Sequence, residues 1–216
     1  MVMAITGLFL TGFVIVHMLG NLQIFLGQDQ LNSYSEHIKD LPMLLWSVRI
    51  FLLLTLITHM TTALKLAFEN RSARPIRYAH EDTVQASFAS RTMVMSGLII
   101  FAFIIFHLLH FTFDKIHPEF SGLLDSTGRD DVYSMVVLSF RDPWVAGSYI
   151  LAMAILCLHL SHGVSSVFQS LGLNNENLRR KIKWAGYVVA FLIFLGNTSM
   201  PLAALLGFLK VPKGGV

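Results

Sequence analysis

Four histidines lie inside four long apolar stretches, at a similar place in each. They are His17, His59, His107 and His159. If the stretches cross a membrane in turn, successive crossings run in opposite directions, so these side chains fall at two depths. Neutral imidazole is a good axial ligand for iron, and two facing imidazoles at one depth can hold one haem. The spacing therefore indicates two haem-binding levels stacked across a bilayer.

The composition supports the membrane interpretation on which this argument depends. Hydrophobic residues make up 54% of the chain, charged residues 13%, and the mean hydropathy is +0.62, which is outside the usual range for a soluble domain. The apolar stretches are long enough to cross a bilayer as helices and lack the strict alternation of barrel strands. We predict an all-α fold in a single membrane domain of residues 1–216, with five spans at about residues 4–26, 43–66, 92–113, 144–168 and 184–208.

The charges predict the orientation of these spans. Positive residues gather in the second and fourth connections, namely Arg71, Arg74, Arg77, Arg91, Arg179, Arg180, Lys181 and Lys183. Such connections face the cytoplasm, which places the N-terminus inside and the C-terminus outside. The net charge of +3 and the pI near 9.1 then need no nucleic-acid partner. A single cysteine, Cys157, excludes an intramolecular disulfide and a cysteine-held cluster.

The expected depths of the four histidines in the membrane sort them into two pairs. At 1.5 Å per residue, His17 and His107 lie roughly 20 Å from the inner surface, and His59 and His159 roughly 8 Å from it. The first four helices are expected to surround the two haems, with each haem held between facing helices. Small and hydroxylic neighbours are expected to admit the macrocycle or accept a ring N–H; these are Gly20, Thr55, Thr62, Gly163 and Ser166.

Other histidines leave alternatives open. Any single histidine in a span can instead be a hydrogen-bonded interior residue. His110 and His162 follow His107 and His159 by three residues, so either can replace its neighbour as ligand. We favour His107 and His159 as ligands and expect the other two to bind propionate, quinone or water. His37, His80 and His117 are interpreted as solvated loop residues.

Four segments resemble the membrane cytochrome b subunit of succinate dehydrogenases and fumarate reductases, in its single-chain type with five helices and two haems. They are FVIVHMLGN, LITHMTTALKLAF, IIFHLLHF and LHLSHGVSSVFQSLG, of which HLSHGVSS is the most specific. The resemblance implies that His17 and His107 ligate a distal haem b towards the outside, and His59 and His159 a proximal haem b towards the cytoplasm.

The resemblance also implies a role. Such a subunit anchors a flavoprotein and an iron–sulfur subunit to the cytoplasmic face of a bacterial cytoplasmic membrane and passes electrons to or from a quinone, here menaquinone. The chain has no dinucleotide-binding glycine motif and no cysteine set, so its share of the enzyme is electron transfer and quinone chemistry. Unlike some members, it has no Asp or Glu in its spans, which leaves the quinone site and any proton route open.

Several polar residues near the outer ends of the helices are candidates for cofactor contacts. Arg49 precedes His59 by ten residues, about 15 Å, and is expected to bind a propionate of the distal haem or to extend to the outer headgroups. His110, His162 and Ser166 are expected to line the haem pockets. Asn21, Gln23 and Asn197 are candidates for a quinone carbonyl, or for hydrogen bonds between helices.

Two other functions fit part of the pattern. A dihaem cytochrome b of another quinone-linked dehydrogenase or reductase has the same helix count and pairing. A histidine-lined metal transporter is the second alternative, although such sites normally add carboxylates or cysteines, and the five spans supply neither apart from Cys157.

Overall fold

The computed structural model describes residues 1–73, 88–172 and 175–212, and their regular structure is helical apart from an isolated bridge between Leu124 and Asp130. Five helical segments in these ranges are long and apolar enough to cross a membrane, which confirms the predicted fold class. The first joins α1 (Val2–Asn21) to the 3-10 helix η1 (Leu22–Leu26), and the others are α3 (Pro42–Ser72), α5 (Met93–Phe111), α7 (Pro143–Ser170) and α8 (Glu176–Leu205). Arg74, Arg77 and His80 lie outside the described residues.

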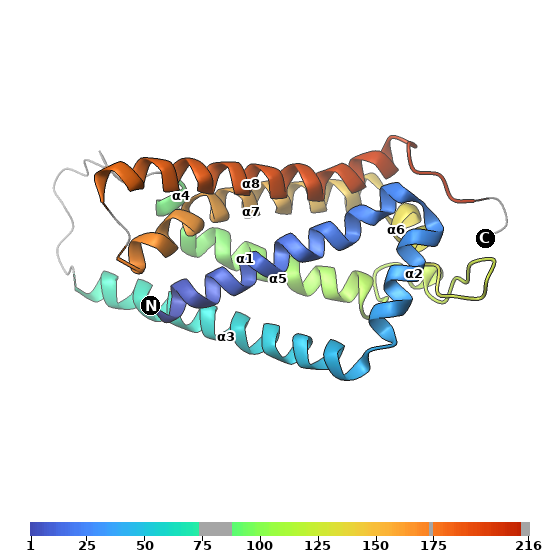
Figure 1. The fold of residues 1–216 in the computed structure, drawn as a ribbon, viewed down its shortest axis with the longest axis horizontal. Helices are drawn as coiled ribbons and strands as arrows, with labels where there is room; N and C mark the ends of the chain where they lie inside the picture. Colours follow the sequence, from blue (N-terminus) through green and yellow to red (C-terminus); the bar gives the residue numbers. More distant parts are fainter. Residues whose placement is uncertain (74–87, 173–174, 213–216) are drawn as a thin grey trace.

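The spans form an elongated bundle (Figure 1). α1 packs against α3, and α5 against α7, while α8 runs along α7 and also contacts α1. Ala190 and Ile193 of α8 are buried against Leu160 of α7. The helix without a histidine therefore supports the helices that carry them. A short helix, α4 (Phe88–Arg91), precedes α5.

Large apolar side chains remain exposed along the spans. Leu8 is 55% exposed, Leu53 57%, Leu151 63% and Phe191 54%. So much apolar surface needs a non-aqueous environment, and hydrocarbon supplies one.

Polar caps mark the places where apolar helices begin. The Asp142 carboxylate accepts the Trp144 N–H at 2.8 Å just before Pro143, the first residue of α7. The Asn175 amide oxygen accepts the Leu178 N–H at 2.8 Å at the start of α8. These bonds satisfy backbone donors that a helix start leaves unpaired.

One end of the bundle carries an ordered cap, where the sequence interpretation expected loops. Residues 28–40 contain α2 (Gln28–Lys39), and residues 114–142 contain the 3-10 helix η2 (Pro118–Phe120) and α6 (Val132–Ser139). Leu31 of α2 and Val137 of α6 share an apolar core with Ile24 and Tyr149. The loop interpretation of residues 28–40 was therefore wrong, and His37 is an exposed residue of α2.

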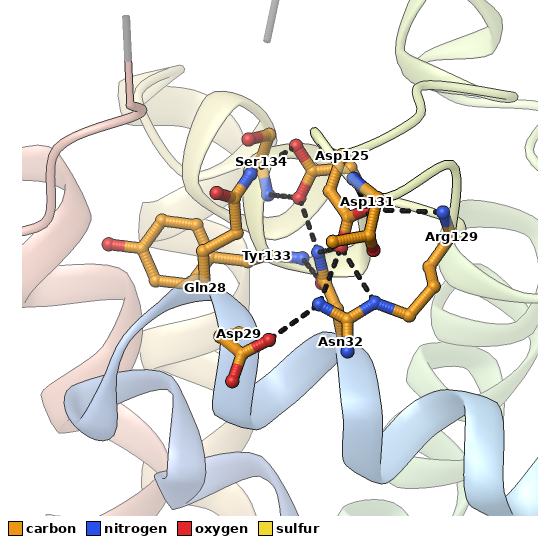
Figure 2. Close-up of polar contacts among 9 residues, drawn as sticks. Gln28, Asp29, Asn32, Asp125, Arg129, Asp131, Tyr133 and Ser134 are labelled. Atoms are coloured by element: carbon orange, nitrogen blue, oxygen red, sulfur yellow. Dashed lines mark hydrogen bonds and ion pairs between the residues drawn. The ribbon is translucent and has the colours of Figure 1, made fainter.

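A buried polar cluster joins α2 to α6 in this cap (Figure 2). The Asp131 carboxylate accepts from Gln28 Nε2 at 2.7 Å, Asn32 Nδ2 at 3.0 Å and the Ser134 N–H at 3.0 Å, so it also caps α6. The Asn32 amide oxygen accepts the Tyr133 N–H at 3.0 Å. Buried amide and carboxylate groups are thus satisfied by one another, as burial requires.

Asp125 anchors the other side of the cluster. Its carboxylate accepts from the Thr127 hydroxyl at 2.7 Å and from Arg129 Nε at 2.9 Å, and Arg129 also binds Asp29 at 2.6 Å. The Thr127 hydroxyl above all, with Asn32 and two backbone N–H groups, holds the pKa of Asp125 well below its usual range. The cap is therefore tied by an ionised carboxylate at neutral pH.

Candidate functional site

His17 of α1 and His107 of α5 face each other. Their ring centroids are 5.8 Å apart and the ring planes are nearly perpendicular, at 88°. Two imidazoles bound at about 2 Å to one metal atom would have ring centres roughly 6 Å apart. The structure thus brings together two residues that the sequence paired, at a spacing suited to one six-coordinate iron.

Tyr149 of α7 holds the α5 side of this pair. Its hydroxyl lies 3.3 Å from Nδ1 of His107 and 3.0 Å from Nδ1 of His110. Tyr149 and His110 are both buried, and Nε2 of His110 has no hydrogen-bond partner. The sequence analysis missed Tyr149. Tyr149 precedes His159 by ten residues, which is about 15 Å along the helix and brings it to the depth of His107.

The other member of the pair is held differently. The Asn21 amide nitrogen lies 3.1 Å from Nε2 of His17, one turn away on α1. An amide N–H only donates, so Nε2 of His17 carries a lone pair. His17 is exposed in the isolated chain, whereas His59, His107 and His159 are half-buried.

His59 of α3 and His159 of α7 each contact the helix beside them. Nδ1 of His59 lies 3.1 Å from the Thr6 hydroxyl of α1, and a Cβ added to Gly7 would lie 3.3 Å from Cε1 of the same ring. Nδ1 of His159 lies 3.0 Å from the Ser96 hydroxyl of α5, and a Cβ added to Gly97 would lie 3.5 Å from Cε1 of His159. Each ring therefore lies against a hydroxyl and a glycine of a neighbouring helix. No ring contact joins His59 to His159, both within the described ranges.

The neighbours expected from the sequence do not make these contacts. The hydroxyls of Thr55 and Thr62 donate to carbonyls of their own helix, at Phe51 and Thr58. Gly20 lies against the Tyr34 ring, and nothing lies near the Cβ position of Gly163. The hydroxyls beside His59 and His159 come from other helices, α1 and α5.

The remaining pocket candidates are His162, Ser166 and Arg49. The Ser166 hydroxyl bonds Nε2 of His162 at 3.0 Å within α7. Arg49 is exposed, with its guanidinium 5.2 Å from the centre of the Trp46 ring, a cation–π arrangement.

Two of the three quinone candidates have partners away from the histidines. Gln23 accepts from Gln30 of α2 at 2.8 Å, and Asn197 donates to the Ile193 carbonyl of its own helix at 2.9 Å. Asn21, bonded to His17, is the one that reaches a paired ring.

His117 is not the solvated loop residue that the sequence suggested. Its side chain is 20% exposed and its Nδ1 lies 2.8 Å from the Glu119 carboxylate, which lowers the pKa of Glu119. Its ring centre is 5.6 Å from that of His110. Nε2 of His117 is buried without a hydrogen-bond partner, like Nε2 of His110.

The donor set fits haem better than a bare metal ion. Within the described ranges, His, Cys, Asp and Glu side chains form no group of three or more that could hold a metal ion. Haem supplies four of its own nitrogen ligands, so pairs of imidazoles on facing helices are sufficient. Gly7 of α1 and Gly97 of α5 also let the rings of His59 and His159 lie close to these helices.

Fold and site together define a polytopic helical membrane protein with histidines on four of its spans, of which His17 and His107 face each other. A family model described as succinate dehydrogenase/fumarate reductase transmembrane subunit matches residues 69–196. That match spans more than half of the 216 residues, and the chain belongs to this family of cytochrome b-type membrane anchors. No curated protein and no solved structure matched the chain.

The matched region contains one histidine of each predicted pair. His107 and His159 lie inside residues 69–196, while His17 and His59 precede them. The family match and the contact between His17 and His107 are thus separate observations, because that contact links a matched histidine to one outside the match.

Proposed function

We propose that this chain is the dihaem cytochrome b subunit of a succinate:quinone oxidoreductase. In this role it carries electrons between an iron–sulfur subunit and a quinone in the membrane. His17 and His107 would hold the distal haem b, and His59 and His159 the proximal haem b. The proposal gives the subunit no part in the dicarboxylate chemistry.

The observation that carries the proposal is the arrangement of the four histidines. They lie on four different spans, and His17 and His107 face each other across two of them at 5.8 Å. His59 and His159 each present Nδ1 to a hydroxyl of a neighbouring helix. An imidazole held by one nitrogen keeps the other for coordination.

The protein side of electron transfer is the positioning of these rings. Bound haem would supply the one-electron redox chemistry. Tyr149 orients His107 through Nδ1, and the apolar spans keep water from the rings. Apolar surroundings with fixed ligands set the potential and limit rearrangement between oxidation states.

The charge distribution supports the proposed partners and orientation. Arg71 lies at the end of α3, Arg91 at the end of α4, and Arg179 and Lys183 in the first turns of α8. These helix ends lie at the end of the bundle that is near the N-terminus (Figure 1). We place this end in the bacterial cytoplasm, where the positive residues suit both topology and docking of the iron–sulfur subunit, which in turn carries the flavoprotein. The cap and the C-terminus then face outside.

The quinone, which we take to be menaquinone, is placed beside the His17–His107 pair. The side-chain amide of Asn21 lies beside His17, and Nε2 of the nearby His110 is buried without a hydrogen-bond partner. Both are suitable donors to a quinone carbonyl. Arg49, His162 and Ser166 remain candidates for contacts with the haem propionates.

The test is purification of the chain with whatever assembles on it, followed by a reduced-minus-oxidised spectrum and quantification of haem. We expect two b-type haems per chain, together with a flavoprotein and an iron–sulfur subunit. A colourless chain would contradict the haem assignment. Two haems with a different dehydrogenase would contradict the partners.

A further inference from the structure

Two hydroxyls occupy equivalent positions beside His59 and His159. Thr6 of α1 lies 3.1 Å from Nδ1 of His59, and Ser96 of α5 lies 3.0 Å from Nδ1 of His159. Each hydroxyl also lies beside a carbonyl of its own helix, Thr6 at 2.9 Å from the Val2 oxygen and Ser96 at 3.1 Å from the Met93 oxygen. The Thr6 hydroxyl also lies 3.1 Å from the Met3 oxygen. Both hydroxyls therefore contact a histidine of another helix and at least one carbonyl of their own.

These contacts bear on where the imidazole proton lies. Each hydroxyl has one proton and lies beside both a carbonyl oxygen, which only accepts, and Nδ1, whose role depends on the tautomer of the ring. When the hydroxyl donates to the carbonyl of its own helix, its oxygen accepts from the ring and Nδ1 carries the N–H. Nε2 of His59 and His159 then keeps its lone pair, which is the form that binds a metal.

The same arrangement occurs twice in the sequence and the fold. Thr6 and Gly7 precede His17 by eleven and ten residues, and Ser96 and Gly97 precede His107 by eleven and ten. Eleven residues make about three helical turns and about 16 Å. Hydroxyl and histidine therefore share one face of each helix at two depths.

The glycine beside each hydroxyl completes the contact. The Cβ positions of Gly7 and Gly97 lie 3.3 and 3.5 Å from Cε1 of His59 and His159. Larger residues at either position would press on the imidazole. The glycine gives the ring room, and the hydroxyl fixes its direction.

We propose that Thr6 and Ser96 are positioning residues that hold His59 and His159 in the Nδ1–H form, with Nε2 directed to a haem iron. The inference rests on the proposed function, because it assigns these histidines as ligands. α1, which supplies His17 to the distal haem, thereby orients His59 of α3 for the proximal haem. In the same way α5, which supplies His107, orients His159 of α7.

The hydrogen bond has an electronic consequence that packing alone lacks. An acceptor at Nδ1–H makes the imidazole a stronger donor to iron, which favours the ferric state. Removing the acceptor should raise the midpoint potential of that haem. A change of about tenfold in the ferric-to-ferrous preference corresponds to about 59 mV for a one-electron couple.

The experiment compares isosteric and conservative variants in the whole purified complex. Thr6→Val removes the hydroxyl and keeps the shape, whereas Thr6→Ser keeps the hydroxyl. Ser96→Ala and Ser96→Thr form the matching pair on α5. Redox titration of both haems and the low-temperature EPR spectrum of the oxidised complex are the readouts, since the EPR signal of low-spin ferric haem responds to ligand orientation.

We expect Thr6→Val and Ser96→Ala to raise the potential and shift the EPR signal of one and the same haem. That haem should be the one lost on replacement of His59 or His159. Thr6→Ser and Ser96→Thr should keep the wild-type potential. Because the two hydroxyls lie on different helices, either pair of variants decides the question if the other fails to accumulate.

Unchanged potentials and EPR signals in both hydroxyl-free variants would overturn the inference, as would a shift confined to the haem that depends on His17 and His107. Either result leaves the proposed function standing if His59→Ala and His159→Ala still remove one haem. Retention of both haems in those histidine variants would instead contradict the proposed function.

Discussion

The two proposed histidine pairs are positioned by different means. His17 and His107 lie next to the cap, among aromatic rings that include Tyr149, Phe103 and Phe111. His59 and His159 lie towards the other end of the bundle, where the hydroxyls of Thr6 and Ser96 contact Nδ1 of the two rings from neighbouring helices. His107 is positioned by packing among aromatic rings beneath a folded cap, whereas His59 and His159 are positioned by two hydroxyl–glycine contacts.

This difference shows in which pair both rings already have Nε2 free for a metal. Nδ1 is held at both His59 and His159, so both rings keep Nε2 for a metal. In the other pair, Tyr149 holds His107 from its Nδ1 side, but Asn21 bonds Nε2 of His17. His17 must exchange the Asn21 bond for a metal bond if it coordinates through Nε2, whereas His59 and His159 need no such exchange.

The largest effect should come from filling the glycine contact of His59. Gly7→Leu places a side chain where the His59 ring lies, so we expect this variant to lose about one of the two haems. Gly12→Leu on the same helix is the control, because nothing lies within 4 Å of its Cβ position. Haem content per chain is the measurement, and equal loss in both variants would show a general packing defect instead.

A smaller effect is expected from Tyr149→Phe, which acts on the pair beside the cap. It leaves two imidazole nitrogens without a partner, at a cost of about 1–3 kcal/mol. We expect a lower Tm for the purified complex and a shifted potential for the haem that depends on His107. Tyr187→Phe is the control, since the Tyr187 ring is 39% exposed. An identical shift at both haems would contradict a role confined to one pair.

The cap itself should respond to acid. The pKa of Asp125 is lowered in the folded protein, so its stabilising effect is complete above the unfolded value of about 3.9 and is lost as pH falls through the lower folded value. We expect hydrogen-exchange protection of α2 and α6 to hold from pH 8 to about pH 5 and to fall at more acid pH. Asp125→Asn should reduce protection at neutral pH, while Asp40→Asn, at an exposed position, should not. Equal protection in Asp125→Asn and the wild type would contradict the carboxylate's role.

The smallest effect is expected for Arg49→Leu. The guanidinium lies over Trp46 on the span that carries His59, about 15 Å towards the cap. Loss of a positive charge disfavours the reduced haem, so the potential of the haem held by His17 and His107 should fall, by less than about 59 mV. Redox titration measures this change in potential. A larger change at the haem held by His59 and His159 would contradict the placement of Arg49 near the other haem.

The sequence was sufficient for the spans because hydropathy and charge determine them. It was insufficient for the cap. Residues 28–40 contain few apolar residues, although Leu31, Tyr34 and Ile38 have the spacing of one helix face. Besides the core contacts of Leu31, α2 is held by Asn32, a buried amide whose partners lie about a hundred residues away. Local patterns do not contain such long-range bonds.

The sequence likewise placed His17 and His107 on facing helices but missed the residues that hold the rings. Thr6, Ser96 and Tyr149 are isolated polar residues in apolar stretches, and nothing local shows that each also reaches a histidine on a neighbouring helix. Register between helices decides this. The hydroxyl–glycine pairs eleven and ten residues before His17 and His107 were the available signal, visible only when the two stretches are aligned with each other.

The most direct test is the single replacement of each of the four paired histidines by alanine, with haem content and redox titration of the purified complex. The account predicts that His17→Ala and His107→Ala remove one and the same haem, and that His59→Ala and His159→Ala remove the other. Loss that groups His17 with His59, or replacements that leave both haems in place, would contradict it.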